Sequence, residues 1–205
     1  MIKSAVIGCG AVSECHLQAI KQYNNAELVA VCDIKAERAK EKADKYGCRY
    51  YTDYKELYET EKPDCVHLCL PHYLHVPAAV YFLYKNVNVF LEKPLAISLE
   101  EGEELIKTAQ KSEANIGICF QNRYNPSVKR LKEIIDKKGL GTVIGTKAEV
   151  TWNRTKEYYT ESGWRGKMTT EGGGVLINQS IHMLDLMQWL FGDISVIKGH
   201  AFTDR

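Results

Sequence analysis

The sequence lacks an excess of charge of either sign. Its 205 residues include 27 Lys and Arg against 26 Asp and Glu, which leaves a formal net charge of +1 at pH 7. Because nothing in this balance would draw the chain to a polyanion, nucleic acid is not expected as a partner. With 45% hydrophobic and 26% charged residues the composition is that of an ordinary globular protein. Small molecules are therefore the first ligands to consider.

Long apolar runs are also missing. The N-terminal segment MIKSAVIGCG holds one lysine and a short apolar stretch that ends at glycine. This pattern fits neither a secretory signal nor a membrane span, so we expect a cytoplasmic protein with no membrane partner. The sequence shows no internal repeat, low-complexity tract or flexible linker either.

The cysteines show no pairing pattern. There are seven, an odd number, and most lie within apolar runs, as expected of reduced thiols that act as small hydrophobic side chains. Cys65 and Cys69 would lie roughly 13 Å apart on an extended strand, which is too far for a shared metal ion. Nowhere along the chain do His, Cys and carboxylate residues recur at a spacing that is typical of metal ligands. We therefore expect no metal.

What the first 120 residues do contain is an alternation of short β-branched runs with amphipathic stretches. Such alternation predicts an α/β fold of the Rossmann type, a doubly wound parallel sheet with helices on both faces. Local chemistry agrees with this reading. Ser98 and Glu101 form a capping box that opens one predicted helix, and Gly47 is placed to end another.

The regular alternation of predicted strands and helices ends after Arg123. We predict a helix over about 126–138, a strand over 143–152 (VIGTKAEVTW), one helix over about 175–191, and the start of a strand within 193–205. Residues 1–122 should form a dinucleotide-binding Rossmann domain. Residues 123–205 should form an incomplete α+β open-sheet domain for substrate binding and oligomerisation, since roughly 80 residues is small for an α/β domain.

The stretch AVIGCGAVS ends the first predicted strand and opens the first helix. Gly8 permits a tight turn, Gly10 lets a phosphate approach the backbone, and the helix start beyond them offers free N–H groups. Ser13 occupies the third fingerprint position in place of glycine or alanine. We interpret the loop as a dinucleotide-binding motif rather than a simple strand-to-helix turn.

Asp33 ends the second predicted strand, about 20 residues after the glycines. A carboxylate there accepts hydrogen bonds from the adenosine ribose and repels a 2′-phosphate, so NAD is favoured over NADP as the cofactor. Lys35 and Arg38 lie near enough in sequence to weaken that preference. The alternative is an aspartate that only terminates a strand.

Two further strand ends, LCLPHYLH and NVFLEKP, should lie on the same edge of the sheet. His72 and His75 would then be near the cofactor, as would Glu92 and Lys93. Burial of Lys93 would disfavour its ammonium form and suit it to acid/base chemistry, with Glu92 as counter-ion. The alternatives are a structural ion pair for Glu92 and Lys93 and ordinary packing for the histidines, including His16.

The last predicted helix carries Asn178, His182 and Asp185 at spacings of four and three, which would place them on one face. The preceding glycine run, 172–174, would let backbones approach closely and favours a functional face over a merely exposed one.

Two arginines and a tryptophan are candidates for substrate contacts. Arg123 and Arg165 could hold a carboxylate or phosphate, and Trp164 offers a flat surface to a sugar ring. Structural roles are the alternative for both arginines.

Four separated motifs together resemble the Gfo/Idh/MocA oxidoreductase family, which includes glucose–fructose oxidoreductase and inositol 2-dehydrogenase. They are GCGAVSECH, LPHYLH, EKP and GGGVLINQSIHMLDLMQWLFG. The resemblance covers nearly the whole chain. It implies an NAD-dependent dehydrogenase that interconverts a secondary alcohol and a ketone on a sugar, cyclic polyol or nucleotide-sugar. Such enzymes have two domains and are often homo-oligomers through the sheet of the second domain.

By this resemblance Lys93 lies beside the reacting carbon, Glu92 contacts the cofactor, and His182 is a second acid/base candidate. Asn178 departs from the aspartate often found at its position and cannot accept a proton, but it could orient a substrate hydroxyl. The catalytic candidates are thus Lys93, His182 and Asn178. The cofactor-binding candidates are Gly8, Gly10, Ala11, Val12, Asp33, Leu70, Pro71, His75, Glu92, Lys93 and Gln121. The substrate candidates are Arg123, Trp164 and Arg165.

Members of this family run farther, so the resemblance also implies a second domain that is truncated relative to theirs. Two other functions stay open. One is a non-catalytic NAD-binding regulator, like a galactose-pathway repressor of the same fold. Retention of Lys93 and His182 argues against it, whereas the shorter second domain argues for lost activity. The other is an NAD-dependent glycosidase, which would release an aglycone with no net change in NADH.

Overall fold

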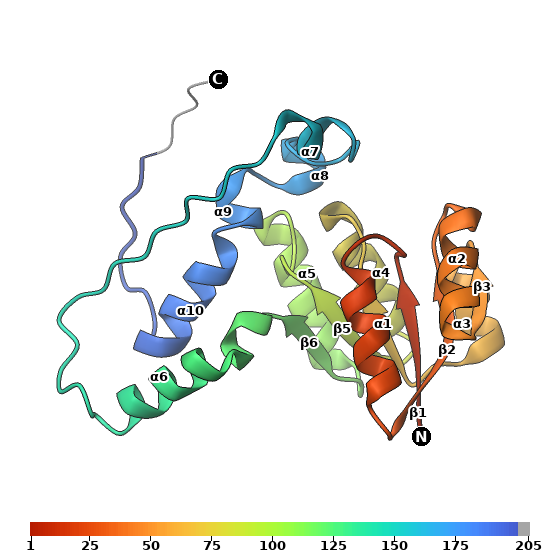
Figure 1. Cartoon of the computed structure of the whole chain (residues 1–205), viewed down its shortest axis with the longest axis horizontal. Coiled ribbons are helices and arrows are strands. Elements are labelled where there is room, and N and C mark those ends of the chain that lie inside the picture. Colours follow the sequence, from red (N-terminus) through yellow and green to blue (C-terminus); the bar gives the residue numbers. More distant parts are fainter. Residues whose placement is uncertain (201–205) are drawn as a thin grey trace. The chain divides into compact units, whose positions relative to one another are not determined.

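The computed structural model describes residues 1–200, and its contacts divide them into two units (Figure 1). The first unit comprises residues 1–119 and 154–178, and the second comprises residues 120–153 and the chain from 179 onward. The contacts thus attach a stretch of the C-terminal half to the first unit. The domain division after residue 122 stays a prediction.

The first unit is built on a six-stranded sheet with the order β3-β2-β1-β4-β5-β6, in which every pair is parallel. The strands are β1 (Ile2–Ile7), β2 (Ala26–Cys32), β3 (Arg49–Tyr51), β4 (Cys65–Leu68), β5 (Asn88–Glu92) and β6 (Ile116–Cys119). The chain builds outward from β1 in one direction as far as β3, and then returns to build outward in the other from β4. This is the doubly wound sheet that the sequence predicts, and the prediction is confirmed.

Helices cover both faces of this sheet (Figure 1). They are α1 (Ser13–Gln22), α2 (Ala36–Tyr46), α3 (Tyr54–Glu61), α4 (His75–Leu83) and α5 (Leu99–Lys111). One apolar cluster joins Val6 and Val31 to α1 and α2, and another joins Ile7 and Leu91 to α3, α4 and α5. Val6 and Ile7 fall into different clusters because neighbouring residues of a strand point to opposite faces. Each such buried side chain contributes about 1.5–3 kcal/mol.

The helix ends follow the local chemistry of the sequence. At the start of α5, Ser98 Oγ accepts a hydrogen bond from Glu101 N at 3.2 Å, while the Glu101 carboxylate accepts from Ile97 N at 3.2 Å. Gly47 ends α2 in the left-handed conformation, with φ of 67°. Both predicted helix boundaries are therefore confirmed.

The turn between β1 and α1 requires glycine at one position. Gly8 has φ of +95°, and a Cβ atom there would lie 2.3 Å from the carbonyl oxygen of Cys69. The end of β4 closes against this turn because Cys69 N donates to Ile7 O at 2.7 Å. A Cβ atom on Gly10, in contrast, would meet no atom within 4 Å.

The remaining helices include two where the sequence predicts one. They are α6 (Pro126–Asp136), α7 (Lys156–Thr160), α8 (Met168–Glu171), α9 (Val175–Asn178) and α10 (Ile181–Phe191), with 3-10 turns η1 (His72–Leu74) and η2 (Gln121–Tyr124). A turn at residues 179 and 180 separates α9 from α10. The Asn178 carbonyl, which would continue the helix, accepts instead from Lys93 Nζ at 2.8 Å. The prediction of a single helix is therefore wrong. The shared face expected for Asn178 and His182 stays a prediction.

The two strands predicted for the C-terminal half do not form in the described residues. Residues 143–152 and 193–200 have no regular secondary structure and are almost all exposed. Residues 201–205 of the second predicted strand lie outside the described residues. A strand persists when a neighbour satisfies its backbone N–H and C=O groups, and the described part of the second unit contains no strand to serve as that neighbour.

None of the helices in residues 1–200 combines the length and the apolar character needed to cross a membrane.

Replacing Gly8 with alanine should lower the free energy of unfolding by roughly 3 kcal/mol, because a left-handed φ and a clash with the Cys69 carbonyl act together. Chemical denaturation followed by circular dichroism measures this. Gly10→Ala is the matched control and should change stability by less than about 0.5 kcal/mol, since its methyl group meets open space. Equal losses in the two variants would contradict the packing described for the turn.

Candidate functional site

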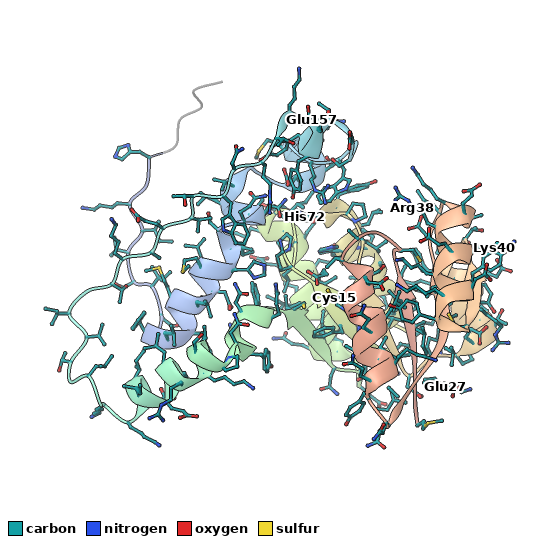
Figure 2. The ribbon with its side chains drawn as sticks, in the orientation of Figure 1. Cys15, Glu27, Arg38, Lys40, His72 and Glu157 are labelled. Carbon is teal, nitrogen blue, oxygen red and sulfur yellow. The ribbon has the colours of Figure 1, made fainter. Side chains whose placement is uncertain are left out.

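The glycine loop and Asp33 lie together beside the point where the strand order reverses. Asp33 Oδ2 accepts a hydrogen bond from Cys9 N at 2.8 Å, and Oδ1 accepts from Lys35 N at 2.9 Å. These backbone donors fix the carboxylate against the loop, and each oxygen retains capacity for a further donor. Arg38 is exposed in the first turn of α2 (Figure 2).

The loop has the features that a dinucleotide needs. Ser13, at the third fingerprint position, is buried, and its hydroxyl donates to Gly10 O at 2.6 Å, so it fits without disturbing the start of α1. Among the residues that the structure describes, none accepts a hydrogen bond from the N–H groups of Ala11 and Val12. With the open space at Gly10, these N–H groups suit a pyrophosphate at a helix start. The residues present therefore fit NAD.

The end of β4 is tied to the end of β5 by His75. This side chain has 0% exposure, and its Nδ1 and Nε2 lie 2.7 Å from Pro94 O and 2.9 Å from Leu70 O. Burial lowers the pKa of His75, although the two carbonyls favour its charged form. A neutral ring carries one N–H, which donates to one of the two carbonyls. The role expected for His75 in cofactor binding stays a prediction. Leu70 and Pro71 remain candidates as the residues that leave β4.

Glu92 and Lys93 turn to different partners instead of pairing with each other. Glu92 Oε1 lies 2.9 Å from His16 Nε2, whereas Lys93 Nζ donates to the backbone oxygen of Asn178 at 2.8 Å and to its Oδ1 at 3.1 Å. The Lys93–Pro94 peptide bond is cis. Neighbouring residues at a strand end point to opposite sides, which separates the two charges. The structural ion pair considered as an alternative is therefore not formed.

A chain of hydrogen bonds holds Glu92 from the α1 side of the sheet. His16 Nδ1 lies 3.0 Å from His67 Nδ1, and burial lowers the pKa of His67 to about 4. Burial is the largest single effect and opposes ionisation of Glu92, but the hydrogen bond and charge of His16, with smaller contributions from Cys119 and Lys93, together leave the Glu92 pKa below its usual value. Glu92 is therefore an ionised carboxylate that accepts from His16.

Potential metal ligands do come together around Glu92, although their spacing along the sequence does not predict it. Ligand atoms of His16, Glu92 and Cys119 lie within 4.8 Å of one another. Spacing along the chain could not reveal this group, because its members come from α1, β5 and β6. His16 and Glu92 already hydrogen-bond each other here, and we assign no metal to the group.

Lys93 is a half-buried cation of the site. Burial lowers its pKa from the ordinary value of 10.5, while the negative charges of Glu92 and Glu171 oppose that change. The net direction is downward, so the neutral amine is easier to reach than in a free lysine.

Asn178 connects Lys93 to a carboxylate that the sequence analysis missed. Asn178 Nδ2 donates to Glu171 Oε1 at 2.5 Å and to Tyr158 Oη at 3.2 Å. The side chain of Glu171 is buried, with 1% exposure. Its sequence position, a charged residue directly before the glycine run, is the one signal that could have drawn attention to it.

The glycine run allows the close approach that the sequence predicts. A Cβ atom on Gly172, which has φ of +85°, would lie 2.6 Å from the Cβ of Ile97. The backbone after α8 therefore packs directly against the segment that follows Lys93 and Pro94, and this prediction is confirmed at Gly172.

Trp164 and Arg165 lie on a loop of the first unit, and Trp164 packs beside His72. The Trp164 ring is 4.7 Å from the His72 ring, and burial lowers the His72 pKa to about 4. The Arg165 guanidinium lies 4.3 Å from the Tyr158 ring centre and 4.9 Å from that of Trp164. Its buried Nε has no hydrogen-bond partner, and within residues 1–200 it pairs with no carboxylate.

Within the second unit, Arg123 forms an ion pair with Asp185. Arg123 Nε donates to Asp185 Oδ2 at 2.8 Å, and its Nη2 donates to Asp185 Oδ1, a bidentate pair that raises the Arg123 pKa. Asp185 takes two of the five N–H donors of the guanidinium, and the role expected for Arg123 in substrate binding stays a prediction. His182 is buried in α10 with its ring edge-on to Phe120 at 6.2 Å, and Gln121 lies in η2. The roles expected for His182 and Gln121 stay predictions.

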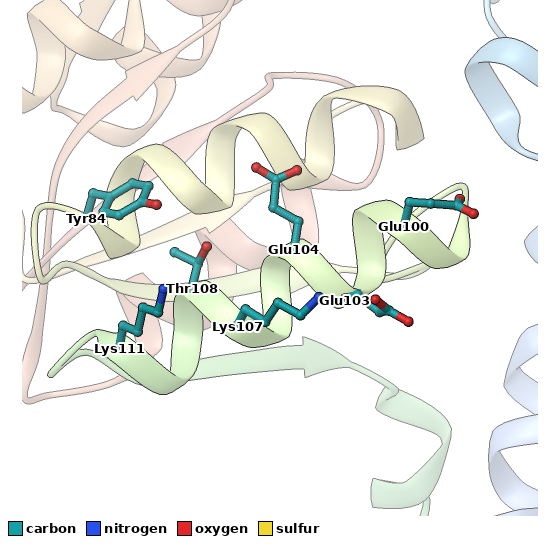
Figure 3. Close-up of a pocket in the computed structure, with 7 residues that line it drawn as sticks. All are labelled: Tyr84, Glu100, Glu103, Glu104, Lys107, Thr108 and Lys111. Carbon is teal, nitrogen blue, oxygen red and sulfur yellow. Dashed lines mark hydrogen bonds and ion pairs between the residues drawn. The ribbon is translucent and has the colours of Figure 1, made fainter.

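A surface hollow of about 390 Å³ lies elsewhere on the first unit, along α5 (Figure 3). It is lined by Tyr84, Glu100, Glu103, Glu104, Lys107, Thr108 and Lys111. No candidate site residue is among them, and an ion pair of 3.2 Å joins Lys107 to Glu103. This hollow is therefore not part of the candidate site, which lies at the ends of the strands.

The comparisons with known proteins agree with this geometry. Residues 2–120 match the GFO_IDH_MocA family, described as an oxidoreductase family with an NAD-binding Rossmann fold, and residues 128–205 match a GFO/IDH/MocA C-terminal domain. D-glucoside 3-dehydrogenase of Escherichia coli is 31% identical over 98% of the chain and 58% of its own length. Glucose-6-phosphate 3-dehydrogenase of Bacillus subtilis is 30% identical over 93% of the chain and 54% of its own length.

A solved structure is similar as well. The WlbA dehydrogenase of Bordetella pertussis, in complex with NADH and UDP-GlcNAcA, is 31% identical with a TM-score of 0.89. The similarity covers 93% of this chain and 58% of that one, so the chain spans little more than half the length of the proteins it matches. The chain belongs to the Gfo/Idh/MocA oxidoreductase family, and its first part is the NAD-binding Rossmann fold of that family.

Proposed function

We propose that this chain binds NAD(H) and serves the interconversion of a secondary alcohol and a ketone on a sugar-like substrate, with Lys93 as the acid/base group. The observation that carries the proposal is the position of Lys93. It is a half-buried amine at the end of β5, held by two hydrogen bonds to Asn178. In a parallel sheet this end lies on the edge that also carries the glycine loop and Asp33.

The residues proposed to hold the cofactor have separate tasks. Ala11 and Val12 offer backbone N–H groups to the pyrophosphate, and Asp33 accepts from the adenosine ribose. Leu70, Pro71 and Glu92 end neighbouring strands and are proposed to line the rest of the binding site. NAD, when bound, supplies the hydride acceptor or donor of the reaction.

Lys93 is suited to move the hydroxyl proton. An ammonium group has three N–H donors, and Asn178 occupies two of them, so one remains for a substrate oxygen. Because burial disfavours the ammonium form, the neutral amine can accept the proton in the oxidation direction. The ammonium returns it in the reduction direction.

We further propose that the substrate carries an anionic group. Arg165 is a cation held between two aromatic rings without a carboxylate partner in the described chain, which suits it to a phosphate or carboxylate. Two of the similar proteins are named for, or shown with, anionic sugars, namely glucose 6-phosphate and UDP-GlcNAcA. Trp164, beside Arg165, is proposed to face the sugar ring.

Calorimetric titration should show tighter binding of NAD⁺ than of NADP⁺. Asp33→Asn should weaken NAD⁺ binding by about tenfold, because a charge-assisted hydrogen bond of about 1.5–3 kcal/mol is lost, and should narrow the gap to NADP⁺. Gly10→Ala is the control, since a methyl group in the path of the phosphate should weaken both cofactors alike. Tighter binding of NADP⁺ by the unaltered chain would overturn the assignment of Asp33.

Lys93→Met should leave NAD⁺ affinity unchanged and lower kcat by about 10²–10⁴-fold, the usual contribution of a general acid or base. In the unaltered chain, oxidation should accelerate with rising pH as the amine loses its proton, with a midpoint below 10.5. The variant should lose this dependence. NADH absorbance follows both, and Lys111→Met, an exposed lysine on α5, serves as the control. Full activity of Lys93→Met would remove Lys93 from the mechanism.

Arg165→Gln should raise KM for glucose 6-phosphate or UDP-GlcNAcA by about tenfold or more, because a charge-assisted hydrogen bond to the anion is lost. KM for a neutral D-glucoside should change little. Lys167→Gln removes the same charge from an exposed side chain two residues away and should have little effect on either class. An equal effect of Arg165→Gln on charged and neutral sugars would contradict the anionic substrate.

A further inference from the structure

Glu171 is a buried carboxylate that the proposed reaction does not use directly. It ends α8, has 1% exposure and lies in the stretch of chain that returns to the first unit. A buried carboxylate is unfavourable unless it is well satisfied, so its partners show what it does for the fold.

Both carboxylate oxygens of Glu171 face donors. Oε1 accepts from Asn178 Nδ2 at 2.5 Å, and Oε2 accepts from the backbone N of Gly166 at 2.6 Å. Both oxygens therefore act as acceptors, which is the role that carboxylate oxygens have. An ionised carboxylate only accepts, and it therefore fixes which end of the Asn178 amide faces it.

The orientation of that amide determines what Lys93 meets. With Nδ2 directed to Glu171, the Asn178 Oδ1 faces Lys93 Nζ at 3.1 Å and accepts from it. The reversed amide would place Oδ1 against a carboxylate and an N–H donor against the lysine. Glu171 thus sets the donor and acceptor pattern around the Lys93 amine without being bonded to it.

The same residue also holds the loop that carries Trp164 and Arg165. The bond to Gly166 N fixes the backbone just after Arg165. The carbonyl oxygen of Glu171 accepts from His72 Nδ1 at 2.9 Å, and the His72 ring packs on Trp164. Glu171 is therefore hydrogen-bonded both to Asn178, which holds Lys93, and to Gly166, which follows Arg165.

We propose that Glu171 is a positioning residue that orients Asn178 toward Lys93 and, through Gly166, fixes the loop of Arg165. This inference rests on the proposed role of Lys93. It accounts for an asparagine at position 178, because an aspartate there would set two carboxylates face to face. The double variant Glu171→Gln and Asn178→Asp should therefore keep the hydrogen bond between these two side chains with its direction reversed. The new amide at position 171 would donate, and the new carboxylate at position 178 would accept.

The test compares Glu171→Gln, Asn178→Asp and the double variant, with Glu161→Gln as the control that removes an exposed charge from the same segment. The direct readout is the titration of the Lys93 side chain, followed by the ¹³Cε chemical shift in the full chain. Steady-state kcat and KM and thermal unfolding are measured in parallel.

Glu171→Gln should lower the Lys93 pKa further, because a negative charge that favours the ammonium is lost. It should reduce kcat by about tenfold or more, the effect of a misplaced catalytic group. Asn178→Asp should move the Lys93 pKa upward, because it adds a negative charge beside the amine. The double variant should return both the titration and kcat toward the original values.

Three results would overturn the proposal. One is a Lys93 titration in Glu171→Gln that matches Glu161→Gln, with only thermal stability lowered. Another is a double variant no better than the worse single variant. The third applies if Glu171→Gln does not fold, and it is a Lys93 pKa in Asn178→Asp that equals the pKa in the unaltered chain. Turnover that survives Lys93→Met while Glu171→Gln still moves the titration would end the proposed function alone.

Discussion

The two hydrogen bonds from Lys93 to Asn178 are the contact on which much of the site depends. The bond to the backbone oxygen is made at the last residue of α9, and the chain turns at residues 179 and 180 before α10 begins. The bond to Oδ1 joins the amine to Glu171 through the amide. One lysine at a strand end thereby contacts a segment 85 residues later in the chain.

The sheet gives this contact its chemical setting. Strand order reverses beside β1, and the ends of β1, β2, β4 and β5 carry the glycine loop, Asp33, Pro71 and Lys93. Local rules fix each end, through a left-handed Gly8 against Cys69 and through backbone donors on Asp33. The shared edge then follows from parallel pairing alone.

These local rules explain what the sequence could predict. Gly8, Gly47 and Ser98 are recognised from their immediate neighbours, and hydrophobic alternation is enough to indicate a parallel sheet. The contacts of Glu92, Glu171 and Arg123 are made with distant segments that meet only after folding. Sequence spacing therefore does not predict these contacts. The strand expected at 143–152 had suitable residues, but a strand also needs a neighbour. The helix expected through residue 180 had suitable periodicity, but a tertiary contact takes the carbonyl that would continue it.

The His75 bridge has a consequence for how the protein moves. Its ring touches the carbonyl of Leu70, just past β4, and that of Pro94, just past Lys93, and it has no contact with solvent. Separating either segment from the sheet would break a contact between the buried imidazole and a carbonyl. A buried polar group without its partner is unfavourable. The segment proposed to touch the cofactor and the segment that carries the amine should therefore open together, as one cooperative unit with a common rate of amide hydrogen exchange.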